Sequence, residues 1–140
     1  MEDFGMSMLW FWTAYMIVTV VGILHTVFNI YVLHMSPMDN DSMGEGYEKT
    51  KPWHPLYNIV LFSIFGYLYM HGLSAPTFAE AILTGAIWAG ICIVFDVFGW
   101  VIIKHPWSLS FKGFYVDYQP WITLIYIAIF LGPIVGFYLC

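Results

Sequence analysis

The sequence predicts an all-α integral membrane protein, a four-transmembrane-helix bundle made of two parallel helical-hairpin repeats. The first observation is composition: 61% of the 140 residues are hydrophobic and only 9% are charged, where a soluble domain has about a quarter charged. The second is a mean hydropathy of +0.77. The third is a set of four apolar runs whose lengths suit the ~30 Å hydrocarbon layer of a bilayer: Met8–His34, Pro55–His71, Ala79–Ile103 and Pro120–Leu139.

Each run is expected to be a helix, because only helices and closed barrels satisfy every backbone group in lipid, and these runs are too long for barrel strands. The first follows an acidic start, "MEDFG", that does not resemble a signal peptide, so we expect it to be retained as a span. Pro55 and Pro120 suit the first turn of the second and fourth helices. In the third, Thr77 and Glu80 have the spacing of a capping box, in which each side chain bonds the other's backbone N–H.

The lysines predict the orientation in the membrane. All of them fall in the two loops 35–54 and 104–119, at Lys49, Lys51, Lys104 and Lys112. Because positive residues concentrate on the cytoplasmic side, we expect these loops to be cytoplasmic and both termini to be outside, in a plasma or inner membrane.

The chain is expected to form one domain of two similar hairpins, about 8–72 and 77–140. The stretch "KPWHPLYNIVLF" (51–62) aligns with "QPWITLIYIAIF" (119–130), and "VFN" (27–29) aligns with "VFD" (94–96). Since each unit would contain two spans, the copies would enter the membrane from the same side, as parallel repeats.

Polar residues inside the apolar runs are the candidate site. His25 and Asp96 each lie eight or nine residues before the cytoplasmic end of their span, which places them at about the same depth. A carboxylate in hydrocarbon costs about 2.5–3.5 kcal/mol and needs a partner, so we expect Asp96 to pair with His25. The proposed ligand or proton site comprises His25, Asn29, Asn58, Asp96 and Tyr126, with Tyr57 and Thr123 as secondary members.

The sequence leaves the role of this polar set open. Buried ionisable groups in a membrane usually mark a ligand site or a pathway, which favours a functional role for Asp96 and His25. Asn29, Asn58 and Thr123 are as well explained by interhelical hydrogen bonds that fix the packing.

Other kinds of site are not supported. The chain has no arginine and no cluster of lysines, so nucleic acid is not an expected partner. His34, His54 and His105 fall at the rim of the spans without a metal-ligand spacing, and the cysteines Cys92 and Cys140 match no metal or redox motif. We therefore predict no metal and no cofactor.

The function expected from these features is binding or translocation of a small ligand or proton within the membrane. The lipid bilayer is the expected environment, and a homo-oligomer or a larger membrane complex is the expected assembly. Two alternatives remain: an accessory subunit of such a complex, and an intramembrane enzyme that uses His25 and Asp96 as base and acid on a lipid-like substrate. The sequence lacks a recognisable catalytic motif, which favours the non-enzymatic reading.

Overall fold

The computed structural model describes residues 1–39 and 43–140 and is helical in all of its regular elements there. Its four long helices are α1 (Phe4–Tyr31), α3 (His54–Gly72), α4 (Phe78–Asp96) and α6 (Trp121–Leu139). The shorter segments are α2 (Gly44–Glu48), the 3-10 turn η1 (Lys51–Trp53), the π-helical η2 (Val97–Ile102) and α5 (Phe111–Tyr115). The all-α class with four long helices is confirmed.

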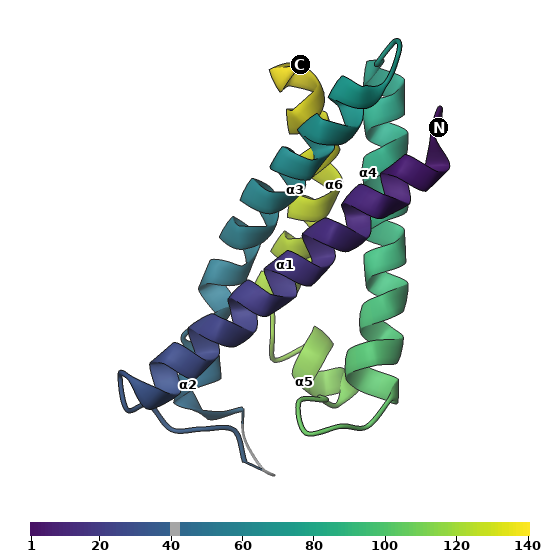
Figure 1. Ribbon diagram of the computed structural model, residues 1–140. Coiled ribbons are helices and arrows are strands. Elements are labelled where there is room, and N and C mark those ends of the chain that lie inside the picture. The colour runs from purple at the N-terminus through teal and green to yellow at the C-terminus, as the bar shows by residue number, and fades with distance from the viewer. Residues whose placement is uncertain (40–42) are drawn as a thin grey trace.

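Helix α1 is oblique to the rest of the bundle (Figure 1). Its 28 residues extend about 42 Å, more than the thickness of the hydrocarbon layer, so a tilt is expected. The carboxylate of Asp3 caps it by accepting a hydrogen bond from the N–H of Met6 at 2.8 Å. The first half of α1 contacts α3 through Trp10 and Phe11 and reaches α4 through Ser7, whereas the second half lies beside α2 and the start of α3.

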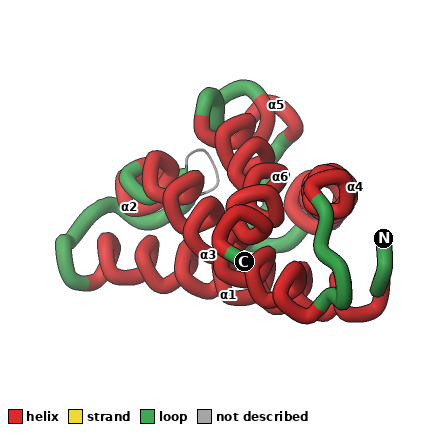
Figure 2. The backbone as a smooth tube through the Cα atoms, turned by 90° about the horizontal axis from the view of Figure 1, so that it is seen from above, coloured by secondary structure: helices red, strands yellow, loops and turns green. Residues whose placement is uncertain are grey.

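Helices α3 and α6 form the closest helix pair, side by side at the centre of the bundle when seen from above (Figure 2). Glycines permit this approach. A Cβ added at Gly66 would lie 2.7 Å from the Cα of Pro133, and one at Gly132 would lie 2.6 Å from the Cβ of Phe62. Small residues at helix contacts let backbones come together in this way.

The predicted helix starts are confirmed with two corrections. Pro55 lies in the first turn of α3 and Thr77 caps α4, accepting from the N–H of Glu80. The second half of the capping box is wrong: the Glu80 carboxylate instead accepts from Tyr69 Oη at 2.8 Å and from the N–H of Glu2 at 3.1 Å, because these donors reach it from α3 and the start of the chain. Pro120 is the N-cap of α6 and not a first-turn residue.

The distribution of side chains is one that suits an apolar surrounding. Polar residues are buried while many large apolar ones are exposed, including Leu24, Phe28, Val94 and Ile103 at 50–61%. Three helical segments are long and apolar enough to cross a membrane: α1, α4 continued by η2, and α6. Helix α3 is less apolar and is not among the segments that are long and apolar enough to cross a membrane. The expectation of four spans is therefore supported for three of them.

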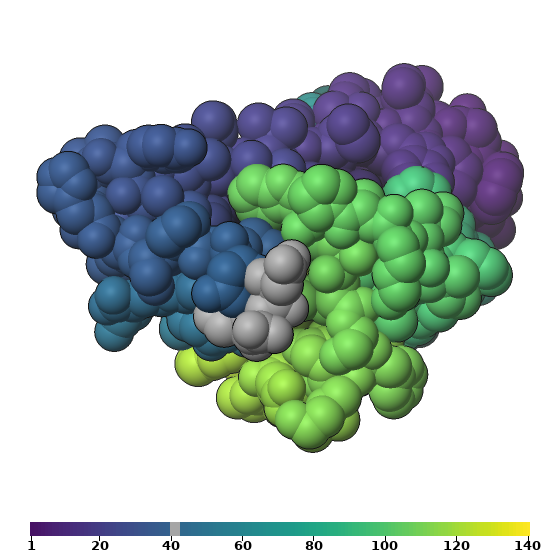
Figure 3. Space-filling model, turned by 90° about the horizontal axis from the view of Figure 1, so that it is seen from below, coloured from purple at the N-terminus to yellow at the C-terminus, as the bar shows by residue number. Residues whose placement is uncertain are grey.

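The connection that carries α2 and the connection that carries α5 lie at one end of the bundle, called the loop end below, and both termini lie at the other (Figure 1). Seen from below, the segment that carries α2 and the segment that carries α5 cover the loop end together (Figure 3). All four lysines belong to this end, within or beside α2, η1, η2 and α5. Their gathering at one end agrees with the predicted arrangement of loops and termini.

We expect Gly66→Ala to destabilise the protein, because the added methyl group would collide with Pro133 across the α3–α6 contact. Overpacking of this kind costs about 1–3 kcal/mol. Thermal unfolding in mild detergent measures the effect. Gly90→Ala is the matched control, since a Cβ there would meet no atom within 4 Å; equal stability of the two variants would contradict the close packing of α3 on α6.

Candidate functional site

The buried carboxylate of Asp96, at the end of α4, collects hydrogen bonds from three side chains. Tyr15 on α1 donates to Oδ1 at 2.8 Å, and Tyr126 on α6 donates to Oδ2 at 3.0 Å. Cys92, one turn earlier on α4, donates its thiol hydrogen to Oδ2 at 3.6 Å. Since Asp96 is only 5% exposed, these bonds replace the water that a carboxylate would otherwise require.

Further hydrogen bonds hold Tyr15 and Tyr126 in place. The indole N–H of Trp100, on η2, donates to Tyr15 Oη at 3.0 Å, which directs the tyrosine's own hydrogen to Asp96. On the other side, the hydroxyls of Tyr115 (α5) and Tyr126 lie 3.0 Å apart. The network centred on Asp96 therefore connects α1, α4, η2, α5 and α6.

Beside Asp96 is a cavity of about 130 Å³ between α1, α3, α4 and α6, bordered at the loop end by residues near α2 and α5. Most of its wall is apolar. Polar side chains reach it at Tyr15, Thr19, Thr26, His54, Asn58 and Asp96.

His54, the first residue of α3, presents an imidazole to this cavity. Its Nδ1 is hydrogen-bonded to Tyr118 Oη. Its Nε2 is buried without a hydrogen-bond partner in the described part of the chain, and it faces α1 at Gly22, where an added Cβ would lie only 3.1 Å away. A buried polar atom left without a partner is costly, so Nε2 is a natural attachment point for a bound molecule.

A cluster that contains the buried cation Lys51 lies near His54 at the loop end of the bundle. Lys51 is 4% exposed, and its ammonium group lies 2.8 Å from Glu48 and 5.0 Å from the centre of the Tyr118 ring. Burial raises the pKa of Tyr47, in α2, to about 12, and it also raises the pKa of Tyr118. Both phenols are therefore neutral at physiological pH, and they pack around an ion pair that is already balanced.

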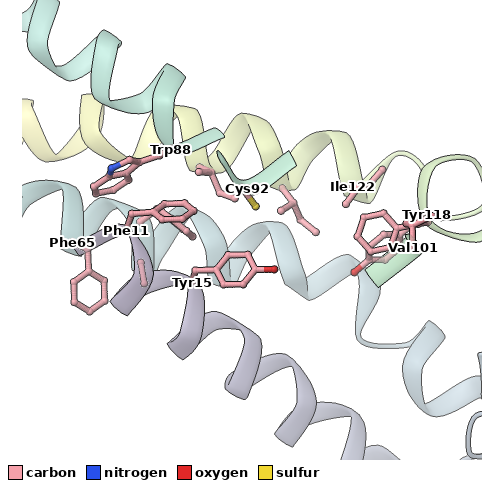
Figure 4. Packing of buried hydrophobic residues seen from close by; sticks show 13 residues of the cluster. Phe11, Tyr15, Phe65, Trp88, Cys92, Val101, Tyr118 and Ile122 are labelled. Atoms are coloured by element: carbon pink, nitrogen blue, oxygen red, sulfur yellow. The ribbon is translucent and has the colours of Figure 1, made fainter. Parts of the chain in front are cut away.

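The middle of the bundle is filled by aromatic rings. Phe11, Phe62 and Trp88 are fully buried, and their ring centres lie 5.8–6.1 Å apart. Figure 4 shows Phe11 and Trp88 packed together on one side of Tyr15, with Tyr118 and Ile122 at the other end of the cluster. The cavity therefore ends at this aromatic layer.

Three of the predicted site residues lie together. Asp96 and Tyr126 are hydrogen-bonded, and Asn58 lines the same cavity, where its Nδ2 donates to the carbonyl of His54 at 2.8 Å. Helices α3 and α6 thus bring Asn58 and Tyr126 to the neighbourhood of Asp96.

The predicted pairing of Asp96 with His25 is wrong. The Nδ1 of His25 is hydrogen-bonded to Tyr57 Oη at 2.7 Å, and its ring lies against Trp53. The reason is the tilt of α1: at the depth of His25 this helix has moved away from α4 and lies beside α3 (Figure 1). His25 is not among the residues that line the cavity beside Asp96.

Asn29 and Thr123 are also outside the cavity. Asn29 donates to the carbonyl of Gly46 at 3.0 Å and so attaches α2 to α1, together with the contact of Thr26 with Thr50. Thr123 is exposed and donates to Gln119 at 2.7 Å. The contact of Asn29 is an interhelical packing bond of the kind that the sequence left open, whereas that of Thr123 is a local bond at the exposed start of α6.

Several cavity residues were not anticipated: Tyr15, Trp100, Tyr118 and His54. Counting depth along α1 places Tyr15 well short of Asp96, but the length of its side chain and the helix tilt bring them together. His54 was assigned to the membrane rim. His54 lies three residues after Lys51, whose burial is visible only in the structure, so the sequence offered no signal that this turn is held inside the protein.

Within residues 1–39 and 43–140, no group of three or more His, Cys, Asp or Glu side chains could hold a metal ion. Comparisons with protein-family models, with curated proteins and with solved structures gave no match. The chemistry of the site is therefore inferred from its geometry.

Removing a donor to Asp96 is expected to destabilise the fold. Tyr15→Phe and Tyr126→Phe should each lower the free energy of unfolding by about 1.5–3 kcal/mol, as expected for a hydrogen bond to a charged group. Tyr31→Phe is the control, because Tyr31 is 75% exposed. A double-mutant cycle with Asp96→Asn tests the contact; additive effects would show that Tyr15 and Asp96 do not interact.

A pH dependence is expected from Tyr47. Its pKa is raised from 10.0 to about 12 by burial, so the unfolded chain loses this proton first as the pH rises. The free energy of unfolding should therefore decrease between about pH 10 and 12, and Tyr47→Phe should show a smaller decrease than the wild type when denaturation is measured at pH 9 and 11. An unchanged pH profile in the variant would contradict the burial of this phenol.

Proposed function

We propose that this chain is an integral membrane protein that binds a small polar ligand in the cavity between Asp96 and His54. The observation that carries the proposal is that a buried carboxylate and a buried imidazole nitrogen, which has no hydrogen-bond partner among residues 1–39 and 43–140, belong to the wall of one cavity. Apolar pockets with a few convergent polar groups are typical of ligand sites, and ionisable residues within a membrane usually mark such sites.

Binding is favoured over translocation. A translocated ligand would have to pass the layer formed by Phe11, Phe62 and Trp88, which are each fully buried. Since packed aromatic rings leave no path for a polar molecule, this arrangement suits a site that is reached from one end of the bundle.

We propose that α3 is a fourth span. Its Leu56, Val60, Ile64 and Leu68 are 36–51% exposed and, at intervals of four, form one stripe along the helix. Such a stripe suits lipid, and α3 is packed against α6 over much of its length. The loop end, which carries every lysine, would then face the cytoplasm, and the cavity would lie in the cytoplasmic half.

We also propose that the two hairpins are repeats. Each half of the chain has the order long helix, short helical segments, long helix. The shared Pro-Trp pairs, at Pro52–Trp53 and Pro120–Trp121, lie at the starts of the returning helices α3 and α6. Because α3 and α6 pack centrally, with α1 and α4 outside them, a parallel duplication provides a simple origin for the bundle.

Ligand-dependent stabilisation tests the binding proposal. A panel of small ammonium, alcohol and carboxylate compounds is titrated in a thermal-unfolding assay, because a ligand at 100 times its Kd stabilises a protein by about 2.7 kcal/mol. We expect saturable stabilisation by at least one compound in the wild type and its loss in Gly22→Leu, whose side chain would enter the space in front of His54 Nε2.

Gly90→Leu is the control for this experiment, since the same change in α4 meets open space. It should respond to the ligand as the wild type does. The proposal would be rejected if no compound in the panel stabilised the wild type, or if Gly22→Leu responded as strongly as Gly90→Leu.

A further inference from the structure

The charge of the cavity wall points to a class of ligand, provided that the cavity binds one as proposed. Among the lining residues, Asp96 is the only acidic one, and there is no lysine or arginine. The buried cation at the loop end, Lys51, is balanced by Glu48 at 2.8 Å. The cavity therefore has one negative group and no positive group to neutralise it.

The hydrogen-bonding groups around Asp96 favour a ligand that donates hydrogen bonds. Around Asp96 the donors are already used: Trp100 donates to Tyr15, and both Tyr15 and Cys92 donate to the carboxylate. A carboxylate has about four acceptor positions, so Asp96 can still accept from a ligand. The donors that contact Asp96 are thus directed at the carboxylate or at each other, and a ligand that brings its own hydrogens can bond the remaining acceptor position.

The imidazole of His54 supplies a second acceptor. Its Nδ1 is bonded to Tyr118 Oη, and in the tautomer whose Nδ1–H donates to that oxygen, Nε2 has a free lone pair. This atom is buried without a partner in the described part of the chain. Like Asp96, this atom would then accept hydrogen bonds from a ligand and donate none.

Aromatic rings form much of the remaining wall, including Tyr15, Trp100, Trp107 and Phe114. Ring faces attract cations, most strongly where water is excluded. The protein already uses this interaction at the loop end, where Lys51 Nζ lies 5.0 Å from the centre of the Tyr118 ring.

From these features we infer that the cavity binds a small organic ammonium ion, held by Asp96 and His54 and surrounded by aromatic rings. The size limit follows from the volume of about 130 Å³. A protein cavity of about 150 Å³ accommodates benzene, so the ligand has about five or six non-hydrogen atoms.

The test compares tert-butylammonium with tert-butyl alcohol, two probes of the same size and shape that differ in charge. Isothermal titration of the purified protein in neutral detergent at pH 7 should show at least about tenfold tighter binding of tert-butylammonium. In Asp96→Asn this preference should disappear. Asp117→Asn, which removes an exposed carboxylate outside the cavity, should retain it.

The outcomes separate this inference from the binding proposal. Equal binding of the two probes, or tighter binding of the alcohol, would overturn the ammonium assignment and leave a neutral-ligand site. A preference that persists in Asp96→Asn would also overturn it. Saturable binding of neither probe would reject both proposals. If Asp96→Asn does not fold, the comparison of the two probes in the wild type decides alone.

Discussion

The need to satisfy one buried carboxylate organises this structure. Asp96 lies at the end of α4, in an interior where water is excluded, and an unpaired charge there would be prohibitively costly. Tyr15 and Tyr126 meet this need from two other helices. Because Trp100 and Tyr115 in turn hold these tyrosines, the demands of a single acid determine how five helical segments converge.

The tilt of α1 explains why the bundle is packed with aromatic rings near its middle and contains a cavity nearer the loop end. Near its start, α1 lies against α4 through Ser7 and Trp88, whose indole N–H donates to the serine hydroxyl at 2.9 Å. Further along it diverges toward α3 (Figure 1). The space opened between α1 and α4 is only partly filled by loop residues, and this leaves the cavity beside Asp96.

The polar groups of α1 consequently have different roles. Those facing α4 support the site, whereas Thr26 and Asn29 hold the first loop segment against the bundle. Estimates of depth from sequence treat helices as parallel rods, so they placed His25 opposite Asp96. A tilted helix moves its side chains sideways as well as downward, and Tyr57 became the partner of His25 instead.

The sequence by itself determined the helical class, the helix limits to within a few residues, the gathering of the lysines at one end and the importance of Asp96, because hydrophobic length, caps and buried charge are local properties. Asn58 and Tyr126 were also found, since they share a depth with Asp96 on neighbouring helices. Only the tertiary structure decided that Tyr15 and not His25 binds Asp96, and that His54 faces a cavity. These depend on the crossing angle of α1, which is set by packing among residues far apart in the chain.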